Sequence, residues 1–358
     1  MSAKQSLLVA LATMALAASG VAQSANVTVF ASGFNNPRGL VFGPDGNLYV
    51  AEGGAGGSAS TAGTCKQVPA PVGPYTGGYT ARISKVAPDG TVTTVADNLP
   101  SSETAATQGN LVSGPSALAF VGKTLYAITA GSGCSHGLAG TDNGVLRINA
   151  DGSTTMVADL SRFQKLNPAT NPEPDDFEPD GTWYSMLAVG NTLFAVEPNH
   201  GELDAISLNG AVQRVADISK LEGHIVPTAM AFTGSSFYVG NLDTFPIKDG
   251  SSKILKISMT GDISVVHIDF SDILGLAFDA KGRLYVLENT TGNPFPTPGT
   301  GMILRVDGKH DYTVIASGLT LPTAMIFGPD GNLYVSNVGF GPPPVGAGQI
   351  VKVTVPAD

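Results

Sequence analysis

The strongest constraint on the fold is an eight-residue segment that occurs twice. Gly43–Val50 reads GPDGNLYV, and Gly328–Val335 repeats it letter for letter. In each copy Pro-Asp-Gly-Asn stands between two short β-prone runs, the first of which begins at Pro37 or Pro322. Proline presets φ for a turn, and Asp and Gly tolerate the positive φ that follows. Each copy is therefore predicted to be a β-hairpin.

Four degenerate versions of this hairpin lie between the two exact copies. The second strands of all six are anchored at Leu48, Leu125, Leu193, Phe237, Leu284 and Leu333. The last three steps are 44, 47 and 49 residues, close to the roughly 45 residues of a four-stranded propeller blade. Each of the first five hairpins is followed by a second one with Asp-Gly, Asn-Gly or Thr-Gly at its turn. The pattern predicts an all-β fold, a six-bladed β-propeller with four-stranded blades.

The last blade lacks one strand, and a matching strand lies at the other end of the chain. The sequence ends soon after Gln349–Val353, whereas Val27–Ala31 resembles Thr313–Ala316, and Ser-Gly follows both. We predict that the strand at 27–31 pairs with the C-terminal blade and closes the ring, which removes exposed sheet edges. Residues 26–358 then form a single propeller domain.

The first two repeats are longer than the others because they carry insertions. These run roughly over 53–79, 98–114, 130–143 and 160–182. Connections of these kinds emerge on one face of a propeller, where loops on a rigid scaffold commonly carry function. Cys65 and Cys134 fall in equivalent insertions of adjacent blades, so we expect a disulfide between them.

The N-terminus has the pattern of a signal for export. Lys4 precedes an apolar run from Leu7 to Ala18, and small residues follow. We expect residues 1–22 to be a signal peptide, with cleavage after Ala22 or Ala25. The run is too short to span a bilayer. The mature protein is therefore expected in the periplasm or outside the cell, as a monomer without stable membrane insertion.

The net charge of the protein limits the kinds of partner that it is expected to bind. The net charge is -10, which argues against nucleic acid and anionic membranes as partners. The remaining partners are a small molecule or a protein of the cell envelope.

Side chains next to the inner strands are expected to converge at the mouth of the central channel. The acidic and amide members suit Ca²⁺ or another divalent cation. These metal candidates are Glu52, Glu197, Asn241, Asp243, Glu288 and Asn337. The alternative is that they cap loops and bind backbone groups at the rim.

Other residues near the channel mouth are candidates for catalysis or ligand binding. His200 or His224, with Glu197 or Glu222, could act as an acid–base pair. Candidates for ligand binding are Arg38, Asn199, Trp183, Tyr184 and Asn289. Each has an alternative structural role: Arg38 could pair with Glu52, and Trp183 could pack inside its blade. The acidic segment Asp175–Asp180 is interpreted as a solvated loop, a lid or a cation site. His136 is a weaker candidate for a functional histidine than His200 or His224.

The chain resembles the ScyD/ScyE-like proteins. The resemblance rests on Asn36–Leu40 with Gly43–Glu52, on Val226–Thr228 with Tyr238–Gly240, and above all on Leu333–Pro342 with Gly346–Ile350. It implies an exported, six-bladed NHL-like propeller. It carries no reaction mechanism and no catalytic residues, and it suggests a place in aromatic pigment biosynthesis only through the name of the family.

Signatures of familiar enzymes are absent from the sequence. There is no Gly-x-Ser-x-Gly, no P-loop and no Cys-x-x-Cys. The leading prediction is a protein that binds a ligand or a partner through the insertion-bearing face. The alternative is a metal-assisted enzyme at the channel mouth, a lactonase, a lyase or a pigment-pathway catalyst. A third hypothesis is an interaction module of the cell envelope.

Overall fold

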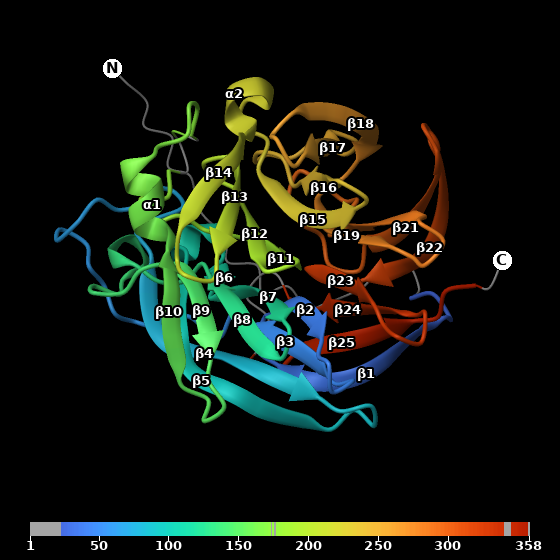
Figure 1. The fold of residues 1–358 in the computed structure, drawn as a ribbon, viewed down its shortest axis with the longest axis horizontal. Helices are drawn as coiled ribbons and strands as arrows, with labels where there is room; N and C mark the ends of the chain where they lie inside the picture. Colours follow the sequence, from blue (N-terminus) through green and yellow to red (C-terminus); the bar gives the residue numbers. More distant parts are fainter. Residues whose placement is uncertain (1–22, 173, 175–176, 340–344, 357–358) are drawn as a thin grey trace, which may run out of the picture.

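Strands organise the molecule into a ring of sheets (Figure 1). The structure is a computed structural model that describes residues 23–172, 174, 177–339 and 345–356. Within these residues the strands form six antiparallel sheets, each built from one sequential group of strands except where the ring closes. The molecule is a six-bladed β-propeller, as the spacing of the hairpins predicts.

The first three blades contain the long repeats. Blade one consists of β2 (Pro37–Phe42), β3 (Leu48–Glu52), β4 (Thr76–Val86), β5 (Val92–Glu103) and the short β6 (Val112–Ser113). Blade two consists of β7 (Pro115–Val121), β8 (Thr124–Thr129), β9 (Gly144–Ile148) and β10 (Thr154–Asp159). Blade three consists of β11 (Ser185–Val189), β12 (Thr192–Glu197), β13 (Glu202–Ser207) and β14 (Val212–Asp217).

The last three blades follow the shorter repeats. Blade four consists of β15 (Pro227–Thr233), β16 (Ser236–Asn241), β17 (Ser252–Ser258) and β18 (Ile263–Phe270). Blade five consists of β19 (Ile273–Phe278), β20 (Leu284–Glu288), β21 (Gly301–Gly308) and β22 (Asp311–Leu319). Blade six consists of β23 (Ala324–Phe327), β24 (Leu333–Asn337), β25 (Gly348–Val353) and β1 (Val27–Phe34).

The two copies of the repeated segment form the same hairpin. In the first, Gly46 has φ +78° and the Asp45 carboxylate accepts hydrogen bonds from Asn47 and from Tyr49, at 2.7 and 3.0 Å. The second copy reproduces these bonds through Asp330, at 3.1 Å each. A positive φ requires glycine or a residue that tolerates the left-handed region, so the shared Asp-Gly sequence has a local structural cause.

The ring closes as the sequence predicts. β1 pairs antiparallel with β25, from Val27 opposite Val353 to Phe34 opposite Gly348, so the first strand completes the last blade (Figure 1). Phe34 is 1% exposed in a cluster that also holds Leu48 of the first repeated segment and Tyr334 of the second. The two copies are therefore neighbours in space.

Apolar side chains fill the spaces between the blades and around the axis. The inner strands approach so closely that a Cβ on Gly39 would lie 2.6 Å from the Cα of Ala117 in the next blade. The six inner strands leave an axial cavity of only about 90 Å³, lined by residues such as Leu40, Met186 and Met325. Because this channel is narrow, we expect the functional face to lie above it, where the loops are.

The insertions contain some regular secondary structure. The sequence predicts a loop over 98–114, whereas β5 continues to Glu103 and pairs with β6, with Ser102 opposite Ser113 and Glu103 opposite Val112. Blade one therefore has a fifth strand. The predicted disulfide is present between Cys65 and Cys134, whose Cα atoms are 6.3 Å apart.

Short helices follow the outer strands of blades two and three. These are α1 (Leu160–Leu166) and α2 (Ile218–Glu222), capped by Asp159 and Asp217. Two single-turn helices lie elsewhere: η1 (Ala106–Gln108) between β5 and β6, and η2 (Cys134–His136) between β8 and β9. None of the helices in the described part of the chain is long and apolar enough to cross a membrane. The predicted signal peptide, residues 1–22, lies outside the described residues.

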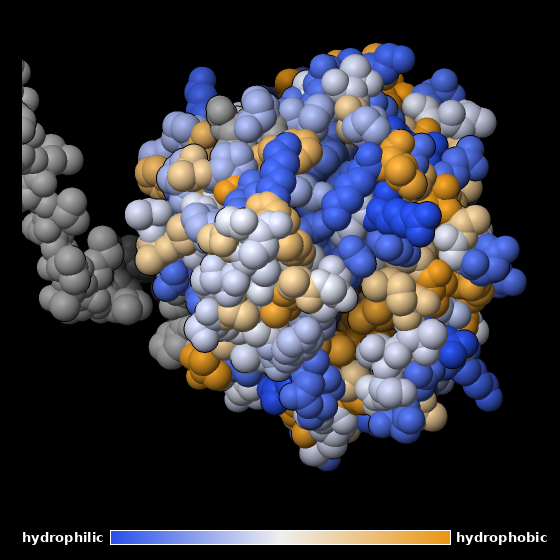
Figure 2. All heavy atoms as spheres, turned by 90° about the vertical axis from the view of Figure 1, so that its left-hand side faces the viewer, coloured by the Kyte–Doolittle hydropathy of each residue, from blue (hydrophilic) through white to orange (hydrophobic). Residues whose placement is uncertain are grey.

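The surface is mixed in character. Figure 2 shows one side of the ring, on which hydrophilic and hydrophobic residues are interspersed in small groups.

Candidate functional site

The predicted metal candidates at the ends of second strands bind backbone groups of their own blades. Each contacts the segment that leads into the first strand. The pairs are Glu52 with Asn35, Glu197 with Thr182, Asn241 with Ile225, Glu288 with Ser271, and Asn337 with Thr320, at 2.7, 2.8, 2.8, 2.7 and 2.8 Å. Among the described residues no group of three or more His, Cys, Asp or Glu side chains is arranged to hold a metal ion. In this structure the five residues anchor loops.

Glu52 and Arg38 have different partners. The buried carboxylate of Glu52 accepts hydrogen bonds from Arg82 Nε at 2.7 Å and from Ser84 Oγ at 2.5 Å. Arg38 donates to the carbonyl oxygen of Val112 at 2.5 Å and interacts with the hydroxyl of Tyr184. Burial lowers the pKa of Arg38, and the Tyr184 hydroxyl partly offsets this effect. Burial likewise raises the pKa of Tyr184 to about 12, against the opposing effect of Arg38.

The carboxylates of the histidine–carboxylate pairs suggested by the sequence have other partners. Glu197 accepts a hydrogen bond from the backbone N–H of His200 at 2.5 Å, while the ring Nε2 of His200 lies 2.9 Å from the carbonyl oxygen of Glu178. Glu222 binds Lys253 at 2.6 Å. His224 borders a cavity, described next.

A cavity of about 690 Å³ lies over the channel mouth on the insertion-bearing face. Five of the predicted ligand-binding, catalytic or metal residues line it together with Trp183: Arg38, Tyr184, Asn199, His224 and Asp243. Apolar parts of the wall are Val72, Leu111, Val112, Leu242, Phe245, Leu274 and Phe295. Volumes of a few hundred Å³ with apolar walls and a few polar groups are typical of small-molecule sites.

Two predicted ligand-binding residues have structural partners. Trp183 is fully buried in the core between blades two and three, and its indole N–H donates to Asp204 at 3.3 Å. Asn289 is outside the cavity wall, and its amide donates to the carbonyl oxygen of Pro322 at 2.8 Å. Asn199 does face the cavity, where it accepts a hydrogen bond from Thr182 at 2.5 Å.

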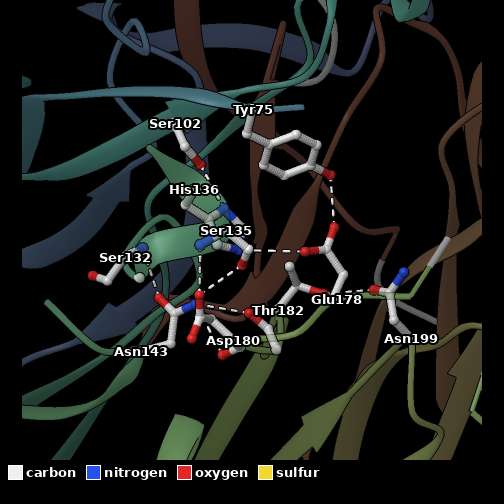
Figure 3. Close-up of polar contacts among 12 residues, drawn as sticks. Tyr75, Ser102, Ser132, Ser135, His136, Asn143, Glu178, Asp180, Thr182 and Asn199 are labelled. Carbon is white, nitrogen blue, oxygen red and sulfur yellow. Dashed lines mark hydrogen bonds and ion pairs between the residues drawn. The ribbon is translucent and has the colours of Figure 1, made fainter. Parts of the chain in front are cut away.

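A buried polar chain connects all four insertions beside the cavity (Figure 3). Tyr75 donates to Glu178 Oε1 at 2.7 Å, and Glu178 Oε2 lies 3.4 Å from His136 Nε2. His136 Nδ1 lies 2.9 Å from the hydroxyl of Ser102. Each of the four residues comes from a different insertion, and Tyr75 and Glu178 form part of the cavity wall. We call Tyr75, Ser102, His136 and Glu178 the four-insertion chain.

Sequence signals for the four-insertion chain are weak. Glu178 belongs to the acidic segment noted above, of which Asp175 and Asp176 lie outside the described residues. His136 was the weakest candidate, and Tyr75 and Ser102 stand in no motif. The usable signal is that His136 is the single histidine in the four insertions, whereas hydroxyl and acidic residues are numerous there.

A second group of acids lies beneath the loops of blades four and five. Asp272 and Glu288 are buried, and desolvation raises the pKa of each to about 7, with nearby acids adding to the effect. Asn293 donates to Asp272 at 2.5 Å and to Asp249 at 2.7 Å, and so joins the two loops.

Because the pKa values of Asp272 and Glu288 are raised, we predict that the folded protein becomes less stable as the pH rises. A carboxyl with a higher pKa in the folded than in the unfolded chain, where it is about 4, stabilises the fold only while protonated. This contribution is complete below about pH 4 and is lost as the pH approaches 7. We expect Asp272→Asn to raise the melting temperature relative to wild type at pH 8 and to give little gain at pH 4. The exposed Asp97→Asn should show no such trend; a flat difference for Asp272→Asn would contradict the prediction.

Comparisons with known proteins support the fold. No protein-family model matches the chain, and no curated protein matches it. A Bacteroides thetaiotaomicron protein of unknown function has a TM-score of 0.59 at 13% identity, over 93% of this chain and 76% of its own. A Xanthomonas campestris gluconolactonase has a TM-score of 0.56 at 12% sequence identity, and the match covers 92% of this chain and 89% of the gluconolactonase. A luciferin-regenerating enzyme has a TM-score of 0.56 at 10% sequence identity, and the match covers 92% of this chain and 94% of that enzyme.

These identities support a statement about fold, not about activity. Several of the similar structures are six-bladed β-propellers of the gluconolactonase type. Together with the ring of sheets and the loop-lined cavity, they define this chain as a member of the class of six-bladed β-propellers.

Proposed function

We propose that the protein is an exported, ScyD/ScyE-like propeller that binds a small molecule in the cavity over the channel mouth. The observation that carries the proposal is the combination of size and lining. The cavity is large enough for a ligand of ordinary size, its wall is mainly apolar, and one buried cation, Arg38, borders it.

Arg38 suggests the polarity of the ligand. A guanidinium that has lost most of its hydration gains from an anionic group, and its fork suits a carboxylate, sulfonate or phosphate. Its backbone contact with Val112 and its interaction with Tyr184 hold the side chain in place before a ligand arrives. The proposed ligand is therefore an apolar molecule with one anionic group.

The test uses two dyes with the same skeleton. 8-Anilino-1-naphthalenesulfonate carries an anionic group, and N-phenyl-1-naphthylamine is its uncharged counterpart. We expect Arg38→Met to weaken binding of the sulfonate by about tenfold, or about 1.4 kcal/mol, and to leave binding of the neutral dye nearly unchanged. Fluorescence titration of each dye measures both affinities.

Two further variants complete this test. Arg38→Lys keeps the charge and should retain part of the sulfonate affinity, and Arg147→Met removes an exposed arginine from β9 and should have no effect. If neither of the two dyes binds the folded wild type, the proposed function is contradicted. Equal losses for both dyes in Arg38→Met would contradict the role of its charge.

An enzymatic function is the second candidate. It is favoured by the four-insertion chain, since a buried carboxylate beside a histidine and a tyrosine can exchange protons with a bound molecule, and by the gluconolactonase among the similar folds. A metal-assisted form would use Ca²⁺ or another divalent cation at the channel mouth. Assaying lactone hydrolysis by the wild type, with and without a chelator, separates this candidate from binding alone.

A further inference from the structure

Two exposed phenylalanines stand at the cavity wall. Phe245 is 46% exposed and Phe295 is 64% exposed, and both line the cavity. They are the two most exposed phenylalanines among the described residues. Exposed apolar side chains grouped at a cavity are characteristic of ligand-binding grooves.

The two rings present nearly parallel faces. Their centroids are 6.4 Å apart and their planes differ by 13°. Paired rings in proteins lie about 4.5–7 Å apart, so this pair is at the wide end of the range. The wide spacing and the large exposed fractions mean that each ring covers little of the other.

The fold holds these rings in place although they lie on loops. Phe245 lies between β16 and β17, and Phe295 between β20 and β21. The backbone N–H of Ile247 donates to Pro294 at 3.3 Å, and Asn293 donates to Asp249 at 2.7 Å. Ile247 is 3% exposed in a small apolar cluster beneath its loop. The loops of adjacent blades are thus joined by two hydrogen bonds next to the ring pair, which reduces the entropy lost on binding.

We propose that Phe245 and Phe295 form a stacking surface for a flat aromatic ring. This inference rests on the proposed function and specifies the ligand as a planar aromatic anion, whose charged group is received by Arg38 at the same cavity. A flat ring gains from offset-stacked contact with phenyl side chains beyond what its apolar area provides. A saturated ring of similar size buries comparable area but lacks this contact.

The experiment compares a planar anion with its saturated counterpart. The probes are 2-naphthoate and decahydro-2-naphthoate, with affinities measured by isothermal titration calorimetry. We expect the wild type to bind 2-naphthoate more tightly. Phe295→Leu, which keeps an apolar side chain, should weaken 2-naphthoate binding about three- to tenfold, the size of one aromatic contact, and leave the saturated probe unchanged. Phe295→Trp should restore the preference.

A matched control and two distinct failures make the outcome interpretable. Leu221→Ala removes an apolar side chain that is 65% exposed on α2 and should change neither affinity. If both probes bind equally and Phe295→Leu changes neither, the stacking surface is refuted while binding in the cavity stands. If neither probe binds the wild type, and the two dyes also fail to bind, the proposed function itself is refuted.

Discussion

We expect Phe34→Ala to lower the free energy of unfolding by about 3–5 kcal/mol. Phe34 ends β1, is 1% exposed and packs in the cluster where the first and last blades meet. Truncation removes buried apolar area and leaves a void that the paired strands cannot easily fill. Urea unfolding followed by circular dichroism measures the effect.

A residue on the same strand supplies the control. Val29 is 56% exposed, and Val29→Ala should change stability by less than about 0.5 kcal/mol, as for most surface substitutions. If the two variants are equally stable, the N-terminal strand does not complete the last blade in solution.

We expect Glu178→Ala to destabilise the protein by roughly 2–5 kcal/mol, because it removes the centre of the four-insertion chain. The hydroxyl of Tyr75 loses its acceptor, and the nearby Nε2 of His136 loses its acidic neighbour in a buried site. Each buried polar group left without a partner costs about 1–3 kcal/mol. Thermal and urea unfolding give the size of the loss.

Glu178→Gln is the matched variant. Glutamine keeps an oxygen that can accept the hydrogen bond of Tyr75, so this variant should lose clearly less stability than Glu178→Ala. Because Tyr75 and Glu178 belong to the cavity wall, Glu178→Ala should also weaken dye binding. Equal stability of wild type and Glu178→Ala would mean that the chain does not hold the insertions together.

The framework of this protein was predictable from sequence because its causes are local. The Asp-Gly turns, the alternating strands and the repeat length act over a few dozen residues, and they gave the number of blades. Even the long-range pairing of β1 with β25 had a local signal, since Val27–Ala31 resembles the fourth strand of the blade before it. The cysteine pair followed from the equivalence of two insertions.

The partners of the polar residues were not predictable in the same way. Glu52 binds Arg82 on β4, where strand register brings the two side chains together. Tyr75 and Glu178 are 103 positions apart, and nothing in either segment specifies the other. Such contacts depend on how four loops pack above the ring, which is set by the whole fold rather than by any motif.

The exposed aromatic pair shows the same limit. Phe245 and Phe295 lie in loops without periodicity, and each is followed directly by a proline. Their exposure becomes informative only once the cavity and the spacing of the rings are known.

The pairing of β1 with β25 also has a kinetic consequence. Strand β1 can pair only after β25 has been synthesised, more than 300 residues later, as Val27 opposite Val353 illustrates. Contacts of such separation form slowly, because a long loop must be closed before the pairing stabilises it. During synthesis five blades can assemble while the edge that β1 will occupy does not yet exist. Completion of the ring is therefore a late step of folding, available only to a chain whose C-terminal strand has left the ribosome.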